Sequence, residues 1–291
     1  MTDTDVDLFG MPVDTNVVNV SSVPQRSPFR YPGGKTWLIP IVRRWLKANK
    51  STAKELIEPF AGGGIVSLTA VAERLVTKAT MVELDEDVSA VWETIFGKDG
   101  NWLAKELLRF KVTPSSVERV LGKRNRSVRQ RAFSTLLKNR VNHGGILAEG
   151  AGLLKHGENG KGLLSRWYPE TLHRRILNII MFKSGIDFIC GDGMNLMKET
   201  ADRTDTLYFI DPPYTVAGKR LYQYPNIDHA MLFSLANELK GDFLITYDDA
   251  LDIRTLASEH GFDLRLIPMM NTHHATKNEL LISRNLDWLG L

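Results

Sequence analysis

The stretch ELIEPFAGGG occupies residues 55–64 and runs directly into IVSLTAVA at residues 65–72. A short apolar segment, a run of three glycines and a second apolar run predict, in that order, a strand, a turn and a helix. In this arrangement the backbone of the glycine turn approaches a nucleotide-like ligand closely. The stretch therefore predicts an α/β fold with a ligand site at the carboxyl end of its strand.

A second strand supports the same class of ligand. Residues 80–83, TMVE, predict a strand that ends in Glu83, at the spacing of about 20 residues from which an acid holds ribose hydroxyls. Ser67 stands where the last small residue of the G-x-G-x-x-G/A fingerprint belongs, which disfavours a nicotinamide dinucleotide. The glycine turn and Glu83 together predict an adenosine-containing ligand.

A third strand ends in an unusual set of polar groups. The apolar run TLYFI at residues 206–210 is stopped by Asp211-Pro212-Pro213-Tyr214, which places Asp211 where open parallel sheets bind ligands. The prolines fix the backbone and have no N–H, so the carbonyls here act only as acceptors. A carboxylate, a rigid carbonyl and an aromatic ring suit a nucleobase with an exocyclic amino group. A strand-ending aspartate before a proline-rich turn is the plain structural alternative for these four residues.

Further segments continue the alternation of strands and helices. Strands are predicted at residues 188–192 and 243–247, helices at 194–199 and 229–239, and a closing hairpin from 264–267 and 280–283. Such alternation with glycine turns predicts a doubly wound, Rossmann-like sheet.

Two features that suggest other chemistry are interpreted as structural. Cys190, the single cysteine, precedes Gly191 at the end of a predicted strand, so we expect a core residue and not a nucleophile. A single cysteine also excludes an internal disulfide and a cysteine-based metal cluster. His273 and His274 have no third ligand at metal spacing, so we expect no metal there.

Charge is distributed unevenly along the 291 residues, although the net charge is only +3. Residues 101–185 hold 17 Lys and Arg against 5 Asp and Glu, or +12, and the rest hold 20 against 29, or −9. Helices are predicted near 102–110, 116–121 and 127–141, followed by a glycine-rich loop. A basic segment on an acidic body predicts a polyanionic partner, with a merely solvated basic face as the alternative.

The N-terminal region divides into two parts. Residues 1–27 show no sustained periodicity of apolar residues, so we expect a mobile or loosely docked arm there. Its polar, acidic start differs from a signal peptide, and no run of the chain approaches the ~18 apolar residues of a membrane span, so we expect a cytoplasmic protein. In residues 29–35, FRYPGGK, a Pro-Gly-Gly turn leads into a helix and presents free N–H groups and a lysine to an anion.

Four motifs stand in a fixed order along the chain. They are Arg30-Tyr31-Pro32-Gly33-Gly34-Lys35, Glu58-Pro59-Phe60-Ala61-Gly62-Gly63-Gly64, Glu83 and Asp211-Pro212-Pro213-Tyr214. Together they resemble the Dam-like DNA adenine methyltransferases, which use S-adenosylmethionine, and the resemblance covers most of residues 28–285. It implies a flexible arm at 1–27, a catalytic domain from 28–100 and 186–291, and a mostly helical target-recognition insert at 101–185.

The resemblance also implies a role for each matched residue. The catalytic motif is Asp211, Pro212, Pro213 and Tyr214. The implied cofactor-binding residues are Tyr31, Lys35, Phe60, Gly62, Gly64, Glu83, Asp192 and Asp211. Gly62 and Gly64 lie at the methionine part of the cofactor, Glu83 holds the ribose and Asp192 reaches the adenine. Family members often have Trp in place of Tyr31 and Asp in place of Glu83, which leaves the contact geometry open.

The basic segment lies where the family carries its target-recognition insert. The predicted DNA-binding residues are Arg124, Arg126, Arg129, Arg131, Lys138, Arg140, Asn142 and His143. We expect the first three to contact phosphates and the last four, where a helix meets a loop, to read bases. The expected partner is double-stranded DNA, and no membrane binding is expected. We expect a monomer, with a transient dimer on DNA as the alternative. The expected context is bacterial or phage-encoded, and a restriction-modification, phage or housekeeping role stays open.

The implied reaction is direct methyl transfer from S-adenosylmethionine to the amino group of a flipped adenine, without a metal. Flipping costs a few kcal/mol, and Tyr214 stacks on the extruded base. Asp211 and the Pro212 carbonyl accept hydrogen bonds from the amino group and stabilise the positive charge that develops on it. Adenine in RNA, the amino group of cytosine, and a DNA-binding module without turnover are the alternatives.

Overall fold

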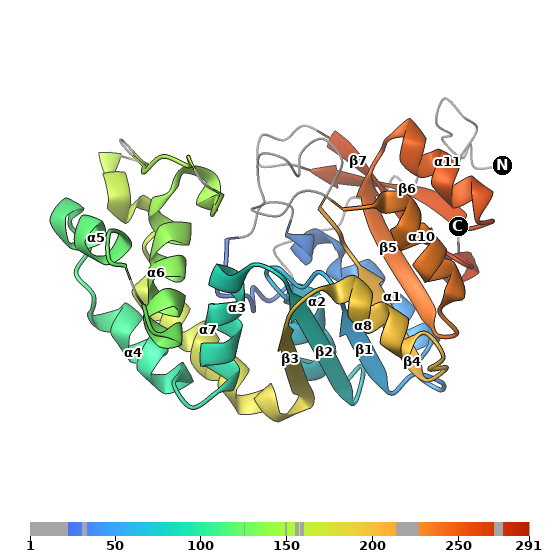
Figure 1. The fold of residues 1–291 in the computed structure, drawn as a ribbon, viewed down its shortest axis with the longest axis horizontal. Coiled ribbons are helices and arrows are strands. Elements are labelled where there is room, and N and C mark those ends of the chain that lie inside the picture. The colour runs from blue at the N-terminus through green and yellow to red at the C-terminus, as the bar shows by residue number, and fades with distance from the viewer. Residues whose placement is uncertain are drawn as a thin grey trace.

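The chain forms a seven-stranded sheet with helices on both of its faces (Figure 1). The computed structural model describes residues 23–30, 34–124, 126–148, 150–154, 157, 160–213, 227–270 and 276–290. The strands are β1 (Glu55–Glu58), β2 (Lys78–Glu83), β3 (Ile186–Cys190), β4 (Thr206–Ile210), β5 (Asp242–Asp248), β6 (Asp263–Met270) and β7 (Thr276–Ser283). Their spatial order is β3-β2-β1-β4-β5-β7-β6, with β1 to β5 parallel and β7 antiparallel to both neighbours. The predicted doubly wound α/β class and the closing hairpin are confirmed.

Helices cover the sheet and extend beyond one of its edges. They are α1 (Ile39–Ala48), α2 (Ile65–Ala72), α3 (Glu86–Phe96), α4 (Gly100–Arg109), α5 (Pro114–Leu121), α6 (Val128–Val141), α7 (Pro169–Phe182), α8 (Gly193–Thr200), α10 (His229–Glu238) and α11 (Leu251–Glu259). Short 3₁₀ turns include η2 (Lys35–Leu38), which leads into α1, and η5 (Gly162–Arg166), which precedes α7. None of the helices in the described part of the chain is long and apolar enough to cross a membrane.

The central strands supply two hydrophobic cores, one on each face of the sheet. Leu56 of β1 and Leu207 of β4 pack against α1 and α2, whereas Ile57 and Tyr208 pack against α8, α10 and α11. Successive side chains of a strand point to opposite faces, so a strand covered on both sides must be apolar at every position. This explains the unbroken apolar run at residues 206–210.

Helices α4 to α7 form a layer beside β3, at the left in Figure 1. Within this layer α6 packs along α3, and α4 packs along α7. Their apolar side chains share one core with α3, where Trp92 stacks on Phe96 and Phe110 meets Phe133 edge-on. The basic segment is mostly helical, as predicted, and its core is continuous with the helix that follows Glu83.

The expectation that Cys190 is a core residue is wrong. Cys190 is exposed at the end of β3, which is the edge strand of the sheet. An edge strand has a hydrogen-bonded neighbour on one side only, so its carboxyl end is not enclosed as the ends of β1 and β4 are. The prediction assumed a central strand.

The expectation of a loose arm is wrong for the part of it that the structure describes. Val23 is buried in the core under α1, and Arg26 lies 3.2 Å from the Glu73 carboxylate at the end of α2. This packing fixes residues 23–27 to the body. Residues 1–22, which make up most of the predicted arm, and the pair His273-His274 lie outside the described residues.

Candidate active site

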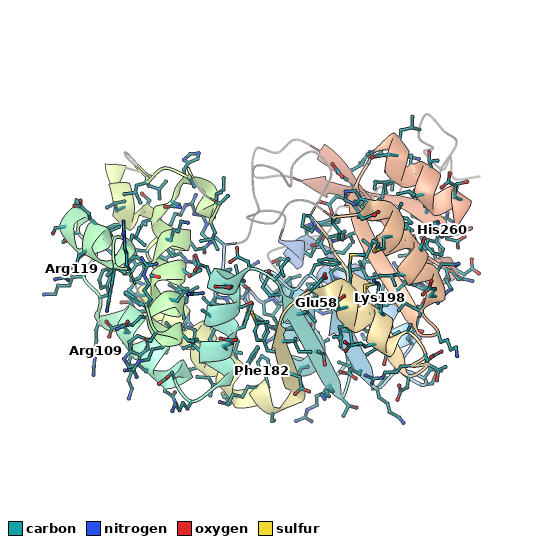
Figure 2. The ribbon with its side chains drawn as sticks, viewed as in Figure 1. Glu58, Arg109, Arg119, Phe182, Lys198 and His260 are labelled. Carbon is teal, nitrogen blue, oxygen red and sulfur yellow. The ribbon has the colours of Figure 1, made fainter. Side chains whose placement is uncertain are left out.

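The carboxyl ends of three parallel strands bring three acids to one edge of the sheet. Glu58 ends β1, Glu83 ends β2, and Asp211 directly follows β4. The chain winds outward from β1 to β3 and then returns to β4, so the strand order reverses between β1 and β4. Open α/β sheets bind ligands at such a point, outside the carboxyl ends of the strands. Glu58, near the middle of the molecule in Figure 2, ends β1, and Asp211 follows β4, so the two acids flank this position.

The glycine turn between β1 and α2 is closed tightly. Gly62 and Gly64 have φ angles of +46° and +62°, in the left-handed region that favours glycine. A Cβ on Gly64 would lie 2.4 Å from Cε of Met81, so a larger residue would displace a core side chain. The indole N–H of Trp92 donates to the Gly62 carbonyl over 2.9 Å and supports the turn from α3. Backbone, rather than side chains, therefore forms this part of the site.

Glu83 ties the end of β2 to the glycine turn. Its Oε2 accepts a hydrogen bond from the Gly62 N–H over 2.9 Å, and its Oε1 accepts one from the Asp85 N–H over 2.8 Å. Burial raises the pKa of Glu83 to about 7, although these backbone N–H groups act in the opposite direction. Each carboxylate oxygen has a second lone pair, so Glu83 can still accept hydrogen bonds from the hydroxyls of a ribose.

Asp211 is held through one of its two carboxylate oxygens. Oδ1 lies 2.9 Å from Nζ of Lys35 and accepts a hydrogen bond from the Thr246 hydroxyl over 2.8 Å. Oδ2 has no hydrogen-bond partner among the residues that the structure describes, and the side chain is 20% exposed. Two donors thus orient the carboxylate, and its second oxygen is left for a ligand.

Lys35 is a buried cation between two acids. Its Nζ lies 2.9 Å from Asp211 and 3.7 Å from Oε2 of Glu279 on β7, and the side chain is only 4% exposed. Burial by itself lowers the pKa of Lys35, but the charges and hydrogen bonds of Asp211 and Glu279 outweigh it, and the pKa is raised. The structure therefore brings Lys35 to the Asp-Pro-Pro motif. Its predicted contact with a cofactor stays a prediction.

Glu58 is a further buried acid at this edge, with 3% of its surface exposed. Its Oε2 accepts a hydrogen bond from the Ser67 N–H, in the first turn of α2, over 3.0 Å. Burial, together with the charges of Asp211 and Glu83, raises the pKa of Glu58 to about 8, although the hydrogen bonds of Ser67 act in the opposite direction. At neutral pH the Glu58 carboxyl group therefore carries a proton most of the time.

Asp192 caps α8 and lies next to the glycine turn. It accepts a hydrogen bond from the Met194 N–H over 2.9 Å and is exposed. A Cβ on Gly193 would lie 2.0 Å from the Pro59 carbonyl oxygen, so the loop after β3 touches the loop after β1. Phe60 is partly buried and packs against the core beneath α8 and α10. Asp192 and Phe60 therefore belong to the same edge as the glycine turn.

The structure describes the predicted catalytic motif in part. Pro212 is buried and Pro213 is half-buried directly after Asp211. Tyr31 and Tyr214 lie outside the described residues, so their predicted roles stay predictions. Over the described part of the chain, no group of three or more His, Cys, Asp or Glu residues is placed to hold a metal ion.

The predicted DNA-binding residues do not share one environment. Arg124 and His143 are exposed. Arg129 and Arg131 lie at the surface but are paired over 3.3 Å and 2.6 Å with acids of the turn before α4 and of α3. Their exposure leaves all four able to contact a polyanion.

The other four predicted DNA-binding residues have roles inside the fold. Arg140 is 4% exposed and donates to the carbonyl of residue 28, and Asn142 is buried and donates to a loop carbonyl over 2.8 Å. Both side chains are thus occupied inside the fold, and base reading by them stays a prediction. Lys138 donates to a loop carbonyl over 2.6 Å, and Arg126 caps the last carbonyls of α5. The pattern of charges did not reveal these backbone partners.

Three further polar side chains line this edge and were not assigned from the sequence. Glu58 stands within the quoted glycine motif, and Thr246 lies at the carboxyl end of a predicted strand, so the sequence could have indicated both as site residues. Glu279 could not be found in this way, because it reaches the site from an antiparallel strand whose position depends on the pairing of β5 with β7.

Comparison with known families bears on residues 31–102, which contain Lys35, Glu58, the glycine turn and Glu83. These residues match the D12 class N6 adenine-specific DNA methyltransferases. The match confirms the methyltransferase resemblance of the motifs in this part of the chain. No curated protein matches the chain.

The solved structures that are similar to this chain are distant in sequence. A putative RNA methyltransferase from Pyrococcus horikoshii is 11% identical with a TM-score of 0.41, over 91% of this chain and 92% of that one. The rRNA methyltransferase aviRa from Streptomyces viridochromogenes is 15% identical with a TM-score of 0.37, over 87% of this chain and 86% of that one. An rRNA methylase from Streptococcus thermophilus is 10% identical with a TM-score of 0.34, over 84% and 94%. These similarities are too distant to bear on the substrate.

Proposed function

We propose that this protein transfers a methyl group from S-adenosylmethionine to the exocyclic amino group of adenine at specific sites in double-stranded DNA. The observation that carries the proposal is the state of Asp211. Its Oδ1 is fixed by Lys35 and Thr246, and its Oδ2 is left to accept a hydrogen bond at the switch point of the sheet. The family match over residues 31–102 supports adenine in DNA as the substrate.

The ends of β1 and β2 suit S-adenosylmethionine. Gly62 and Gly64 turn the backbone tightly at the end of β1, which lets a ligand approach the main chain there. Glu83 would hold the ribose hydroxyls, and Asp192, which caps α8, would reach the adenine of the cofactor. When bound, S-adenosylmethionine supplies a methyl group on a positively charged sulfur. The Asp211 carboxylate, and Glu83 when it is ionised, give this edge a negative charge that favours such a cation.

The Asp-Pro-Pro motif orients the amino group that accepts the methyl. The Asp211 Oδ2 and the Pro212 carbonyl oxygen are two acceptors for the two amino hydrogens of adenine. Held in this way, the nitrogen directs its lone pair away from both acceptors, and the positive charge that develops on it is stabilised. Lys35 and Thr246 fix the carboxylate beforehand, so little reorganisation is needed during the reaction. Tyr214 would stack on the adenine after it leaves the duplex.

Residues 101–185 would supply the DNA contacts. This segment carries a net charge of +12, and its helices α4 to α7 form the layer beside β3 (Figure 1). Arg124 and His143 are exposed there and are the clearest candidates for polyanion contact. Positive side chains of this kind neutralise phosphates, while contacts to base edges define the sequence that is methylated.

Labelled-methyl transfer tests the proposed function. Purified protein is incubated with labelled S-adenosylmethionine, a chelator and double-stranded DNA, single-stranded DNA or RNA, and the products are analysed as nucleosides. We expect N6-methyladenine in double-stranded DNA, and Asp211→Ala serves as the inactive control. Methylcytosine, or transfer to RNA alone, would contradict the proposed substrate. Cofactor and DNA binding without any transfer would show a binding module.

A further inference from the structure

Three arginines from distant parts of the chain converge on residues 27–30. Arg175 of α7 donates to the Ser27 carbonyl over 2.9 Å, and Arg140 of α6 donates to the Pro28 carbonyl. Arg30 follows two residues later. Its backbone N–H and carbonyl are both bonded over 2.9 Å to the side chain of a buried asparagine of α6. The three guanidinium groups are therefore held around one short segment of backbone.

The cluster has more donors than the fold uses. A guanidinium group offers five N–H donors. Within the described part of the chain, the Arg30 guanidinium has no hydrogen bond or ion pair, the Nε of Arg140 is buried without a partner, and no carboxylate pairs with Arg30, Arg140 or Arg175. Burial, together with the like charges of Arg175 and Arg30, lowers the pKa of Arg140 to about 9. The fold thus places uncompensated positive charge in one spot.

A purely structural role does not account for this charge. Residues 27–30 are already fixed by the hydrogen bonds from Arg140 and Arg175 to two carbonyls and by those of Asn139 with the Arg30 backbone. The charge of Arg30 adds repulsion to the pair and makes no bond with the described residues. Buried or half-buried charges of one sign are costly unless a group of opposite charge joins them. An anion that binds there would use the free donors and remove the repulsion.

We propose that the half-buried Arg30 and Arg175 bind a backbone phosphate of the polynucleotide substrate, and that the buried charge of Arg140 adds to the attraction. This inference rests on the proposed function, because it takes its polyanion from it. Guanidinium groups match phosphate oxygens through paired N–H donors, and several around one site select a phosphate over a single carboxylate.

The distance along the chain limits which phosphate is bound. Arg30 precedes Lys35 by five residues, and five residues span at most about 18 Å. Lys35 contacts Asp211, so the cluster lies near the reacting end of the site. Phosphates of one strand advance about 3.4 Å each along the axis of duplex DNA. The bound phosphate is therefore expected within about five nucleotides of the target adenine.

The first test compares Arg30→Gln with a matched loss of charge elsewhere. Lys198→Gln is the control, because Lys198 is exposed on α8 and lies outside residues 101–185 (Figure 2). We expect Arg30→Gln to weaken DNA binding on every sequence and to reduce the slope of log K against log salt concentration by about one unit. Lys198→Gln keeps the wild-type slope, and both variants keep wild-type melting temperature and S-adenosylmethionine affinity. Arg175→Gln is a second variant with the same expectation.

The second test locates the phosphate and separates the outcomes. Duplexes with a neutral methylphosphonate at one position at a time are bound to wild-type protein and to Arg30→Gln. We expect one position, within about five nucleotides of the methylated adenine, to weaken the wild type and to have no effect on the variant. The inference is overturned if Arg30→Gln keeps the wild-type salt slope and the wild-type pattern of methylphosphonate interference. It is also overturned if the variant loses binding of inorganic phosphate but binds DNA as the wild type does. If the wild-type protein neither binds nor methylates DNA, the proposed function itself fails.

Discussion

The ammonium group of Lys35 lies 2.9 Å from Oδ1 of Asp211, and this ion pair joins the first and last motifs of the site. Lys35 opens the short turn η2 that leads into α1, while Asp211 follows β4, so the contact fixes the N-terminal turn against the switch point of the sheet. Glu279 lies on the other side of the same ammonium, at 3.7 Å. One buried cation thus holds three segments in place and decides which oxygen of Asp211 faces a substrate.

Asp211→Asn should remove nearly all methyl transfer while the fold is kept. The amide oxygen would take the place of Oδ1 beside Lys35 and Thr246, and the amide NH2 would then face the amino group of adenine as a second donor. We expect kcat to fall by about a hundredfold or more, as for the loss of one group that stabilises developing charge. Steady-state kinetics with thermal melting measures this. Activity within about tenfold of wild type, about 1.4 kcal/mol in the barrier, would show that Asp211 is not central.

Thr246→Val should lower kcat by about tenfold, about 1.4 kcal/mol, without changing KM for either substrate. The valine has the shape of threonine but cannot donate the 2.8 Å hydrogen bond that orients Asp211. Thr246→Ser is the matched control, because it keeps the hydroxyl and should keep most of the activity. A purely structural role would instead lower the melting temperature of both variants and leave kcat of the folded protein unchanged.

Lys35→Met should destabilise the protein by about 3 kcal/mol, because it leaves Asp211 and buried Glu279 without their cation. Adding Glu279→Gln to this variant removes one of the two uncompensated charges and should restore part of the loss. Urea denaturation of the two single variants and the double variant measures the coupling. Additive effects of the two substitutions would be evidence against a charge interaction between Lys35 and Glu279.

Glu58→Gln should change how stability depends on pH. The pKa of Glu58 is raised from 4.5 to about 8 in the folded protein, so between these values the folded state binds more protons than the unfolded state. The free energy of unfolding therefore contains a contribution that decreases as pH rises from about 4.5 to 8, by at most about 1.4 kcal/mol per unit. Glutamine has no such proton and can still accept the Ser67 hydrogen bond.

Urea denaturation from pH 5 to 8.5 tests this expectation. The difference in stability between Glu58→Gln and wild type should shift in favour of the variant as the pH increases. Glu199→Gln, an exposed position on α8, is the matched control and should show a constant difference. A constant difference for Glu58→Gln as well would mean that Glu58 titrates in the folded protein as it does in the unfolded chain.

The sequence predicted those elements whose ends are marked by proline or glycine. Residues 206–210 and 65–72 match β4 and α2 at both ends, because two prolines stop the first and a glycine turn opens the second. The helices α3 and α7 were not predicted. No glycine or proline cluster separates α3 from the strand before it. The helix α7 follows a long glycine-rich loop, which obscures where its helical spacing of apolar residues begins.

The site could be predicted as far as it depends on local chemistry. Glu83 and Asp211 follow strands in the sequence, and parallel strands necessarily bring their carboxyl ends to one edge. The partners of Lys35 could not be predicted, since Glu279 arrives on an antiparallel strand from the far end of the chain. The burial of Arg140 was equally hidden, because a sequence shows a charge but not the carbonyl that the charge faces.

Gly64→Ala should weaken S-adenosylmethionine binding and destabilise the fold by more than its backbone strain alone. A non-glycine residue in the left-handed region costs roughly 1–2 kcal/mol, and overpacking against Met81 at 2.4 Å adds about 1–3 kcal/mol. Gly261→Ala is the matched control, since its φ is also positive, at +65°, and a Cβ there meets no atom within 4 Å. Denaturation should therefore give a larger loss for Gly64→Ala. Calorimetry should give weaker cofactor binding for that variant alone, because the clash with Met81 displaces the turn. Equal cofactor affinity in the two variants would show that cofactor binding does not depend on the conformation of the turn at Gly64.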